Sequence, residues 1–379
     1  MLLRNPVGLG LVLLVFLLFG CLQFESETVS KGPIKVGVIL PLSGNGAVYG
    51  EWGKNALEIA KDEINGKGGI NGRPIKLIFE DGKFNAQESV NAYNKLRRLD
   101  NVSYVITMGS SPAVAISPLA NWDGVIQMDF SATTSAYRSK NDFTFRTAPK
   151  AEQFGVDTAN WFVNHEQNEV NVLYINNDQG ISIFNAFKDA YESAGGTIAG
   201  MESFEQDGFD FRTVIQKAVR DKDHYVFLIG HLKESGLVVR QMNEMGYFNP
   251  IFSHVYSVEG SDFLESARAF QNTIVYLAPV FDPRKNSAAV AYNESYQNRF
   301  GVDAEYFGTF AFDALNVLSV ALSECENPID TNCVKNELFQ TADYPGLTGT
   351  ISFDEFGDRQ VDLALKTVKN GEFILYSEQ

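Results

Sequence analysis

Residues 34–65 read IKVGVILPLSGNGAVYGEWGKNALEIAKDEIN and contain an apolar strand, a glycine-rich turn and an amphipathic helix in succession. Apolar residues dominate positions 34–40, and apolar residues recur three or four apart after the turn. A continuous apolar strand followed directly by a helix is typical of parallel sheets covered by helices on both faces. The stretch therefore predicts an α/β protein, and it leaves open what the glycines of the turn are for.

The glycines at positions 44, 46 and 50 allow two interpretations. A dinucleotide-binding turn has the pattern G-x-G-x-x-G, and Glu80 and Asp81, which end the next apolar run, could supply its ribose-binding acid. The third glycine, however, falls one residue too late for that pattern. The alternative is an ordinary strand-turn-helix unit whose turn forms the wall of some other pocket.

The same alternation of apolar runs and helical patterns continues along the chain. It runs once through about residue 148 and restarts near residue 160, which predicts two similar lobes, each a doubly wound parallel sheet. The candidate strands are Ile34–Leu40, Ile75–Phe79, Tyr104–Met108, Val125–Met128, Asn171–Ile175, Tyr225–Ile229, Ile251–His254 and Ile274–Leu277.

The C-terminal third departs from this rhythm. Residues 304–322 form a long, strongly apolar helical pattern, which we expect to be buried in the first lobe. The sequence after it alternates like an antiparallel hairpin with its turn at 355–358. The chain would then cross between the lobes three times, near Ala148, Pro279 and Gly346, and these crossings would form a hinge. The predicted lobes are 34–148 plus 279–345, and 149–278 plus 346–379.

The N-terminus indicates export. The apolar run 7–19 is too short to span a bilayer comfortably but has the length of a secretory signal. The tetrapeptide LFGC, ending at Cys21, resembles a bacterial lipobox, in which the cysteine is lipidated. We therefore expect a signal peptide over 1–20, a lipid anchor at Cys21 and a polar spacer over 21–33. An uncleaved N-terminal anchor is the alternative, and either arrangement tethers the protein outside the cytoplasm, in the periplasm or on the outer face of the cytoplasmic membrane.

The remaining cysteines fit an exported protein. Cys325 and Cys333 leave an even number once Cys21 is assigned to lipid, which predicts a disulfide bond between them. A zinc site is the rival interpretation, but two thiols with no histidine nearby are a poor ligand set. We expect no metal and no cofactor.

Composition bounds the function. Removal of residues 1–20 leaves 379 − 20 = 359 residues, enough for two domains. A formal net charge of −16 argues against nucleic acid or an anionic membrane surface as a partner. The four histidines are scattered, and no G-x-S-x-G nucleophile motif occurs, so the sequence favours a protein that is not an enzyme.

Small polar residues follow two of the predicted strands. Ser110 and Ser111 precede Pro112, a residue suited to the start of a helix, so free N–H groups would gather beside a serine hydroxyl and could bind an anion. A simple helix cap explains the same serines equally well. At the end of the next strand are Ser131, Ala132 and Thr133, and Thr133 is 23 residues after Ser110.

Several segments together resemble a known family, the substrate-binding proteins of ABC transporters of the leucine/isoleucine/valine-binding type. The resemblance covers nearly the whole exported chain and is carried by the opening stretch, YVITMGSSPAVAISPLA, FSATTSAYR, FRTAPKAEQFG, DFRTVIQKAVRDKDHYVFLIG and GLTGTISFDEFGD. It implies the type I periplasmic binding fold, a small ligand held between the lobes, delivery to an ABC permease, no cofactor and a monomeric receptor.

The resemblance also answers the question of the glycines. In this family the glycine-rich turn forms part of the cleft wall, and the position of a ligand-contacting aromatic is matched by Tyr49. Ligand carboxylates are bound by a serine, a backbone group and a threonine, which match Ser110, Ser131 and Thr133, with Ala132 between the last two. The resemblance therefore favours a carboxylate site over a helix cap and a pocket wall over a dinucleotide turn.

The second lobe departs from the family pattern. Gln179 and His231 occupy positions where the family commonly has aromatic residues, and Tyr256 replaces the acid that pairs with a ligand ammonium group. An unpaired buried ammonium would be costly. Either Asp178 or Glu259 substitutes for that acid, or the ligand is an aliphatic or aromatic carboxylate or an amide rather than an ordinary α-amino acid.

Three functions remain after this comparison. The first is a transport receptor that captures a small carboxylate and delivers it to a permease. The second is a ligand-sensing module with the same fold, although the chain has no fused signalling segment. The third, an exported hydrolase, lacks a nucleophile motif.

Overall fold

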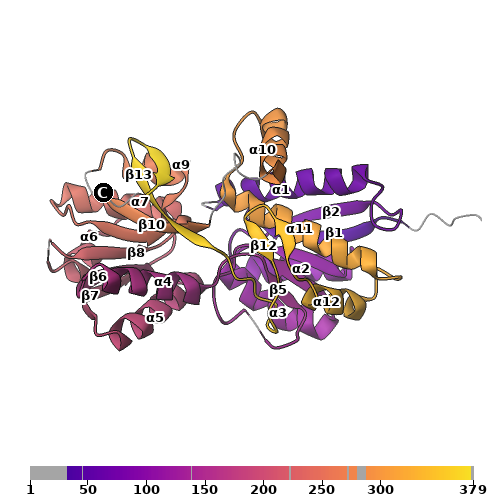
Figure 1. The fold of residues 1–379 in the computed structure, drawn as a ribbon, viewed down its shortest axis with the longest axis horizontal. Helices are drawn as coiled ribbons and strands as arrows, with labels where there is room; N and C mark the ends of the chain where they lie inside the picture. Colours follow the sequence, from indigo (N-terminus) through magenta and orange to yellow (C-terminus); the bar gives the residue numbers. More distant parts are fainter. Residues whose placement is uncertain are drawn as a thin grey trace, which may run out of the picture. The chain divides into compact units, whose positions relative to one another are not determined.

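A computed structural model describes residues 32–44, 46–137, 139–221, 223–270, 273–279 and 287–376. The predicted signal peptide, Cys21 and nearly all of the predicted spacer lie outside these residues. Residues 33–379 form one compact unit, and the description below concerns this unit alone. Its described residues form two large sheets with helices packed around them and one two-stranded sheet (Figure 1).

The first sheet has the strand order β2-β1-β3-β4-β5, and its neighbouring strands are all parallel. This order is that of a doubly wound sheet, as the apolar strands separated by helices predict. Its strands are β1 (Ile34–Leu40), β2 (Ile75–Asp81), β3 (Tyr104–Thr107), β4 (Ile126–Asp129) and β5 (Thr144–Arg146). The helices of this first lobe are α1 (Ala47–Gly66), α2 (Ala86–Arg98), α3 (Ser110–Asp123), α10 (Ser287–Phe300), α11 (Tyr306–Glu324) and α12 (Thr331–Phe339).

The second sheet repeats the arrangement and extends it. Its order is β14-β13-β10-β9-β8-β6-β7, parallel from β10 to β7 and antiparallel where β13 and β14 join. Its strands are β6 (Glu169–Ile175), β7 (Thr197–Phe204), β8 (Tyr225–Ile229), β9 (Ile251–His254), β10 (Ile274–Pro279), β13 (Leu363–Lys369) and β14 (Glu372–Leu375). The helices of this second lobe are α4 (Ala151–Asn164), α5 (Asp178–Ser193), α6 (Arg212–Ala218), α7 (Leu232–Glu244), α8 (Val255–Val258) and α9 (Ser261–Ala267).

The central strands are buried on both faces, which explains their continuous apolar sequence. Val36 and Val38 of β1 are completely buried, as are Val226 and Phe227 of β8. Edge strand β7 was not predicted, because Gly200, Glu202 and Ser203 interrupt its apolar residues. An edge strand is covered less completely and therefore tolerates such residues.

The apolar helix predicted over 304–322 is α11, and it packs against α1 in the first lobe as expected. Among the described residues it is also the helix that is long and apolar enough to span a membrane by length and composition. Most of that apolar stretch, 78%, is buried inside the protein, so its composition is explained by a position in the core.

The third crossing between the lobes lies further along the chain than the predicted position near Gly346. The short strands β11 (Tyr344–Gly346) and β12 (Gly349–Ile351) form a hairpin, and Leu347 N donates to Asp313 of α11 at 3.0 Å. The chain joins the second sheet only at β13 (Figure 1). The contacts of residues 346–361 differ from the predicted placement in the second lobe, because Asp358 and Arg359 pair with Arg146 and Asp313 of the first lobe, whereas Val361 O accepts a hydrogen bond from Gln153 of α4.

The predicted turn at 355–358 is present, but it is not the turn of the C-terminal hairpin. Gly357 N donates to Asp354 O at 2.9 Å and closes the turn. The antiparallel hairpin forms instead between β13 and β14, around Asn370 and Gly371, which both have positive φ angles. Alternating sequence predicted strands here but did not indicate which strands pair, since that depends on the edge of the second sheet that β13 meets.

Cys325 and Cys333 form a disulfide bond, as predicted, with a Cα–Cα distance of 6.1 Å. The bond closes the short loop between α11 and α12. It therefore links the C-terminal end of α11 to α12 within the first lobe.

Candidate functional site

Six strand ends supply the site. Parallel strands of a doubly wound sheet place their carboxyl ends on one edge, where ligands bind at the point where the strand order reverses. In the first lobe that point lies between β1 and β3, and in the second between β6 and β8. Tyr49 follows β1, Ser110 follows β3 and Ser131 follows β4, whereas Gln179, His231 and Tyr256 follow β6, β8 and β9.

Residues from these strand ends line three adjoining cavities. The largest has a volume of about 250 Å³, and Tyr49 and His231 lie on its wall. The other two have volumes of about 10 Å³ each. One is lined by Ser110, Ser111 and Gln179 among others, and the other by Ser131, Tyr256 and Gln179. Seven of the predicted residues are thus brought together around one cleft, namely Tyr49, Ser110, Ser111, Ser131, Gln179, His231 and Tyr256, whereas Ala132, Thr133 and Asp178 line none of the three cavities.

Backbone groups of the first-lobe loop are already hydrogen-bonded. Ser131 N and Ala132 N donate to Asp129 Oδ1 at 2.7 and 2.5 Å, and Thr133 N donates to Ser110 Oγ at 3.1 Å. The Ser110 hydroxyl also accepts from Thr134 N at 3.4 Å. Ser110 therefore shapes the loop, and the N–H of Ser131, the predicted backbone group, donates to Asp129 in this structure, as does the N–H of Ala132.

Three hydroxyls of the predicted set have no hydrogen-bond partner in the described part of the chain. They belong to Ser131, Thr133 and Tyr256, whose side chains are at least nine-tenths buried. A buried hydroxyl without a partner costs about 1–3 kcal/mol, and most buried polar groups in proteins are paired. The hydroxyls of Ser131 and Tyr256, whose residues line one of the small cavities, are therefore available to a ligand, whereas Thr133 lines none of the three cavities.

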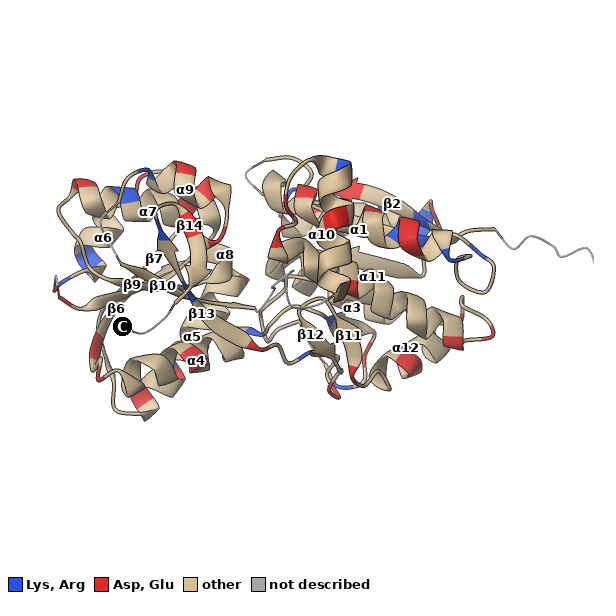
Figure 2. Cartoon of the chain, turned by 45° about the horizontal axis from the view of Figure 1, so that its top comes forward, with Lys and Arg blue, Asp and Glu red and all other residues tan. Residues whose placement is uncertain are grey.

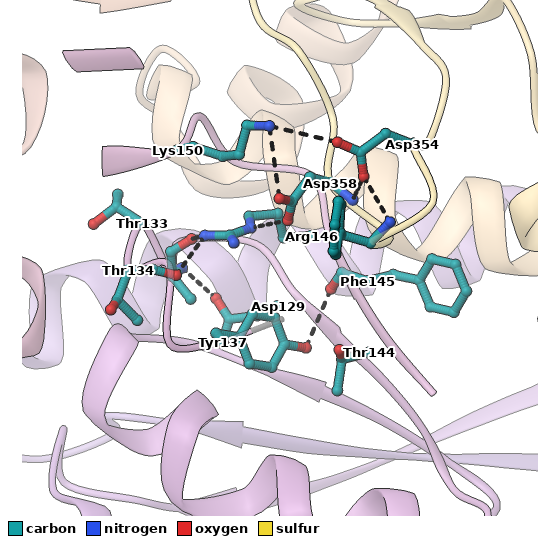
Figure 3. Close-up of polar contacts among 12 residues, drawn as sticks. Asp129, Thr133, Thr134, Tyr137, Thr144, Phe145, Arg146, Lys150, Asp354 and Asp358 are labelled. Atoms are coloured by element: carbon teal, nitrogen blue, oxygen red, sulfur yellow. Dashed lines mark hydrogen bonds and ion pairs between the residues drawn. The ribbon is translucent and has the colours of Figure 1, made fainter. Parts of the chain in front are cut away.

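A buried arginine fixes the carbonyl side of the same loop (Figure 3). Arg146 Nη1 donates to Ala132 O and Thr134 O at 3.0 and 2.9 Å, and its Nε donates to Asp358 Oδ1 at 2.5 Å. Both charged side chains are almost completely buried. Because Asp358 follows the turn that precedes the third crossing, the loop is tied to the chain segment that leads to the second lobe.

Burial also changes the acidity of Asp129. Removal from water raises the pKa of this carboxyl from 3.8 to about 7, although hydrogen bonds from Ser131 N, Thr107 Oγ1 and Ala132 N and the charge of Arg146 act in the opposite direction. Asp129 is completely buried and does not line the three cavities. Its role is to hold the loop rather than to meet a ligand.

The second lobe presents a neutral pair. His231 Nε2 lies 3.1 Å from Gln179 Oε1, and burial lowers the pKa of the imidazole below its usual 6.5. The amide oxygen can only accept, so the neutral ring carries its proton on Nε2. This pair can offer hydrogen bonds to a ligand but no charge.

Tyr49 connects the two lobes across the cleft. Its hydroxyl accepts from Leu232 N at 3.0 Å and donates to Tyr256 O at 3.2 Å. A second contact joins Thr134 Oγ1 to Ser182 Oγ at 2.7 Å. The predicted position of Tyr49 on the cleft wall is where the structure places it, and its hydroxyl bonds the opposite lobe.

Neither acid considered as an ammonium partner lines the three cavities. Glu259 is engaged elsewhere, with Lys366 Nζ at 2.5 Å and Tyr276 Oη at 2.9 Å. Asp178 opens α5 and is absent from the cavity walls, although its neighbour Gln179 lies on two of them. The carboxylates that do line the large cavity are those of Asp207, Glu234 and Asp262.

Sequence reasoning missed two aromatic walls. Phe84 lies between β2 and α2 and borders all three cavities, and Phe307 of α11 borders the cavity that contains Ser131. The only signal for Phe84 was its position just after a strand end. Phe307 belongs to an apolar helix, where one cleft-facing ring cannot be told from the core.

Charge elsewhere on the molecule is spread rather than concentrated. Asp and Glu residues occur on helices of both lobes, and Lys and Arg residues also occur in both (Figure 2). Within the described ranges, no three His, Cys, Asp or Glu side chains are grouped so that they could hold a metal ion.

Comparison with known proteins agrees with this architecture. Residues 33–372 match the family described as periplasmic binding protein. A Leu/Ile/Val-binding protein homolog of Brucella abortus is 25% identical over 341 residues, covering 89% of this chain and 91% of the relative.

Solved structures give the same result. The branched-chain amino acid binding protein LivJ of Streptococcus pneumoniae, in complex with isoleucine, has a TM-score of 0.80 and 25% identity, covering 90% of this chain and 97% of the other. A solute-binding protein of an ABC transporter from R. palustris, in complex with benzoate, has a TM-score of 0.81 and 17% identity, covering 91% and 95%, and shows the shared fold.

The paired doubly wound sheets and the match over most of the chain lead to one conclusion. The chain belongs to the periplasmic binding protein family, as an extracytoplasmic solute-binding receptor of the ABC-transporter type.

Proposed function

We propose that this receptor captures a small carboxylate-bearing ligand in the cleft and delivers it to an ABC permease. The observation that carries the proposal is the set of three buried hydroxyls, of Ser131, Thr133 and Tyr256, that have no partner among the described residues. Hydroxyl donors and the free N–H groups at the start of α3 suit the oxygens of a carboxylate. Isoleucine and benzoate, the ligands of the two solved relatives, share that group.

The mechanism is closure of a hinge on the ligand. The carboxylate binds the first lobe through Ser110, Ser131 and Thr133, and Gln179, His231 and Tyr256 then complete the pocket from the second lobe. The three crossings between the lobes serve as the hinge. A ligand stabilises the closed form only to the extent that it binds closed better than open, so second-lobe contacts are essential to the response.

The neutral character of the second-lobe residues supports a ligand whose inner end carries no ammonium group. His231 is held neutral by burial, and no carboxylate lines the two small cavities. An ammonium there would lose its hydration without gaining a charged partner. Aliphatic or aromatic carboxylates are therefore expected to bind more tightly than the matching α-amino acids.

The test is a thermal-shift screen followed by titration calorimetry. Carboxylates, amides, α-amino acids, sugars and nucleotides are screened, because a ligand at a hundred times its dissociation constant adds about 2.7 kcal/mol of stability. Thr133→Val should weaken carboxylate binding about fivefold, the net value of roughly one hydrogen bond. Its fold should be unharmed, because the lost hydroxyl has no partner in the protein.

Thr158→Val is the matched control. Thr158 Oγ1 is also buried and unpaired among the described residues, but it lies on α4 of the second lobe and not on the loop after β4 that carries Ser131 and Thr133. Its substitution should leave affinity unchanged. Equal affinities in the Thr133 variant and the parent protein, or a sugar or nucleotide as the best ligand, would contradict the carboxylate site.

Membrane tethering is the remaining part of the proposal. Cys21 lies outside the described residues, and the lipobox-like sequence that ends there supports lipid attachment. Cys21→Ser should move the protein from the membrane fraction to the soluble fraction. Retention of that variant in the membrane would favour an uncleaved N-terminal anchor.

A further inference from the structure

Phe84 occupies the point where the three cleft cavities meet. It and His231 are the two residues that border all three. The large cavity carries the charged side chains of Lys83, Glu234 and Asp262, whereas the two small cavities have no charged residue on their walls. We call the small cavities the inner compartment and the large one the outer cavity. The phenyl ring separates a neutral space from a charged one.

We infer that Phe84 is a specificity-determining residue that limits the length of the ligand by closing the inner compartment against the outer cavity. The inference rests on the proposed carboxylate function of the cleft. A ligand whose carboxylate meets the hydroxyls of Ser131 and Tyr256 lies in the small cavity that Phe84 and His231 also border. Because each small cavity has a volume of only about 10 Å³, a longer tail fits only where it can pass the ring of Phe84.

Glycines make room for this ring. A Cβ atom on Gly109 would lie 2.6 Å from Phe84 Cε2, and one on Gly46 would lie 3.4 Å from Phe84 Cβ. Gly109 also has a φ of +105°, which favours glycine for a second reason. The ring is packed against His231 at a centroid distance of 5.2 Å and is stacked on Tyr49 at 6.3 Å. Both lobes therefore contact it.

The backbone beneath the ring is held in an uncommon conformation. Lys83 and Phe84 have φ angles of +49° and +57°, in the left-handed region that bulky residues rarely adopt. Such a conformation persists only where surrounding contacts impose it, and it is often found at ligand-binding sites. The position of the ring is thus a built feature of the loop between β2 and α2.

The contacts that impose it come from both sides of the loop. Asp81 accepts from Leu42 N and Lys83 N at 2.9 Å each, and from Ser43 Oγ at 2.6 Å. Asn85 caps α2 by accepting from the next helix N–H groups. The backbone that carries the ring is consequently anchored to the turn that follows β1 and to the start of α2.

The test measures how binding affinity depends on the length of the ligand. The full chain in mild detergent and its Phe84→Ala variant are titrated with straight-chain carboxylates from propanoate to decanoate and with phenyl-substituted carboxylates, together with the matching amides and α-amino acids. The parent should lose affinity sharply, by about tenfold or more per added methylene, beyond one limiting length. In the variant that limit should move to longer ligands, because the tail can enter the outer cavity.

Phe84→Leu and Phe209→Ala complete the set. Leucine keeps an apolar side chain of smaller reach, so the limit should move less than with alanine, and this variant serves if alanine does not fold. Phe209 is 81% exposed and lines none of the three cavities, so its substitution should leave the profile unchanged.

Two other outcomes have separate meanings. Weaker binding of every length by the same factor in Phe84→Ala, with the limiting length unchanged, would overturn the inference, since the ring would then only stabilise the fold. If no carboxylate, amide or α-amino acid in the test binds the parent chain, the proposed carboxylate function itself fails.

Discussion

The two lobes contribute half-sites of opposite character. The first lobe presents unpaired hydroxyls on a loop whose backbone is tied down by Asp129 and Arg146. The second lobe presents side chains that largely satisfy one another, such as the His231–Gln179 pair, with Tyr256 as the exception. The first lobe can bind a ligand without breaking an existing hydrogen bond. The second lobe must first give up bonds such as the one between His231 and Gln179. If the proposed function is correct, we expect a ligand to bind the first lobe before the second.

The largest expected effect comes from breaking the rigidity of the first half-site. Arg146→Met would leave Asp358 buried without its closest cation, at a cost of about 3–5 kcal/mol in the free energy of unfolding. Lys150, 3.6 Å from Asp358 Oδ2, would offset part of that cost. Urea denaturation measures the loss, and calorimetry should show weaker ligand binding because Ala132 O and Thr134 O lose their donor.

Lys140→Met is the matched control for that variant. Lys140 and Glu355 form an exposed ion pair at 2.6 Å on the same turn, and exposed pairs contribute at most about 1 kcal/mol. A loss of stability in Arg146→Met no greater than in this control would show that the loop does not depend on the buried pair.

The second prediction uses the pH dependence of stability to distinguish the buried ionisable groups of the two lobes. Burial raises the pKa of Asp129 to about 7, above its value of 3.8 in an unfolded chain. Its contribution to stability is therefore fully present below about pH 4 and is lost as pH rises through 7. The loss amounts to at most about 4 kcal/mol, since each pKa unit corresponds to about 1.4 kcal/mol. Asp129→Asn should remove this dependence, as seen by urea denaturation between pH 4 and 8.

The counterpart in the second lobe has the opposite sign. Burial, aided by the neighbouring His231, lowers the pKa of His254 from 6.5 to about 3. Its contribution is present above pH 6.5 and is lost as pH falls toward 3, by about 2 kcal/mol at pH 5. His254→Asn should remove this acid-side loss. If both variants change the pH profile in the same direction, the electrostatic contrast between the lobes is wrong.

The smallest expected effect concerns the contact between the halves. Tyr49→Phe removes the hydroxyl that bonds Leu232 N and Tyr256 O, leaving both groups unpaired in the closed form at a cost of about 1–3 kcal/mol. Water can pair them when the cleft opens, so the variant should favour the open form. Small-angle X-ray scattering should report a larger radius of gyration in the absence of ligand.

Tyr93→Phe is the control for this change. Its hydroxyl donates to Asp123 Oδ2 at 2.9 Å within the first lobe, so its loss should affect stability without changing the separation of the lobes. An unchanged radius of gyration in Tyr49→Phe would mean that other contacts, such as Thr134 with Ser182, hold the cleft closed.

The strand ends show how much of the structure the local sequence pattern can predict. Continuous apolar runs predicted most central strands within one or two residues, and small polar residues after β3 and β4 indicated where the first half-site lies. This worked because a parallel sheet places consecutive strand ends on one edge. Predicting the partners was harder: Glu259 was a candidate ammonium partner, yet Lys366, 107 residues away, engages it.

The sequence by itself determined the fold class, the disulfide and the family. Apolar periodicity, cysteine number and motif order can be recognised along the chain without knowing which residues meet in space. Only the tertiary structure decided that the hydroxyls of Ser131, Thr133 and Tyr256 have no partner among the described residues, that Leu347 and Asp358 bond first-lobe residues, and that Phe84 borders all three cavities. Each of these depends on which groups from distant segments come within hydrogen-bonding or packing distance. Burial and pairing of that kind are properties of the folded chain and are not encoded at any single position.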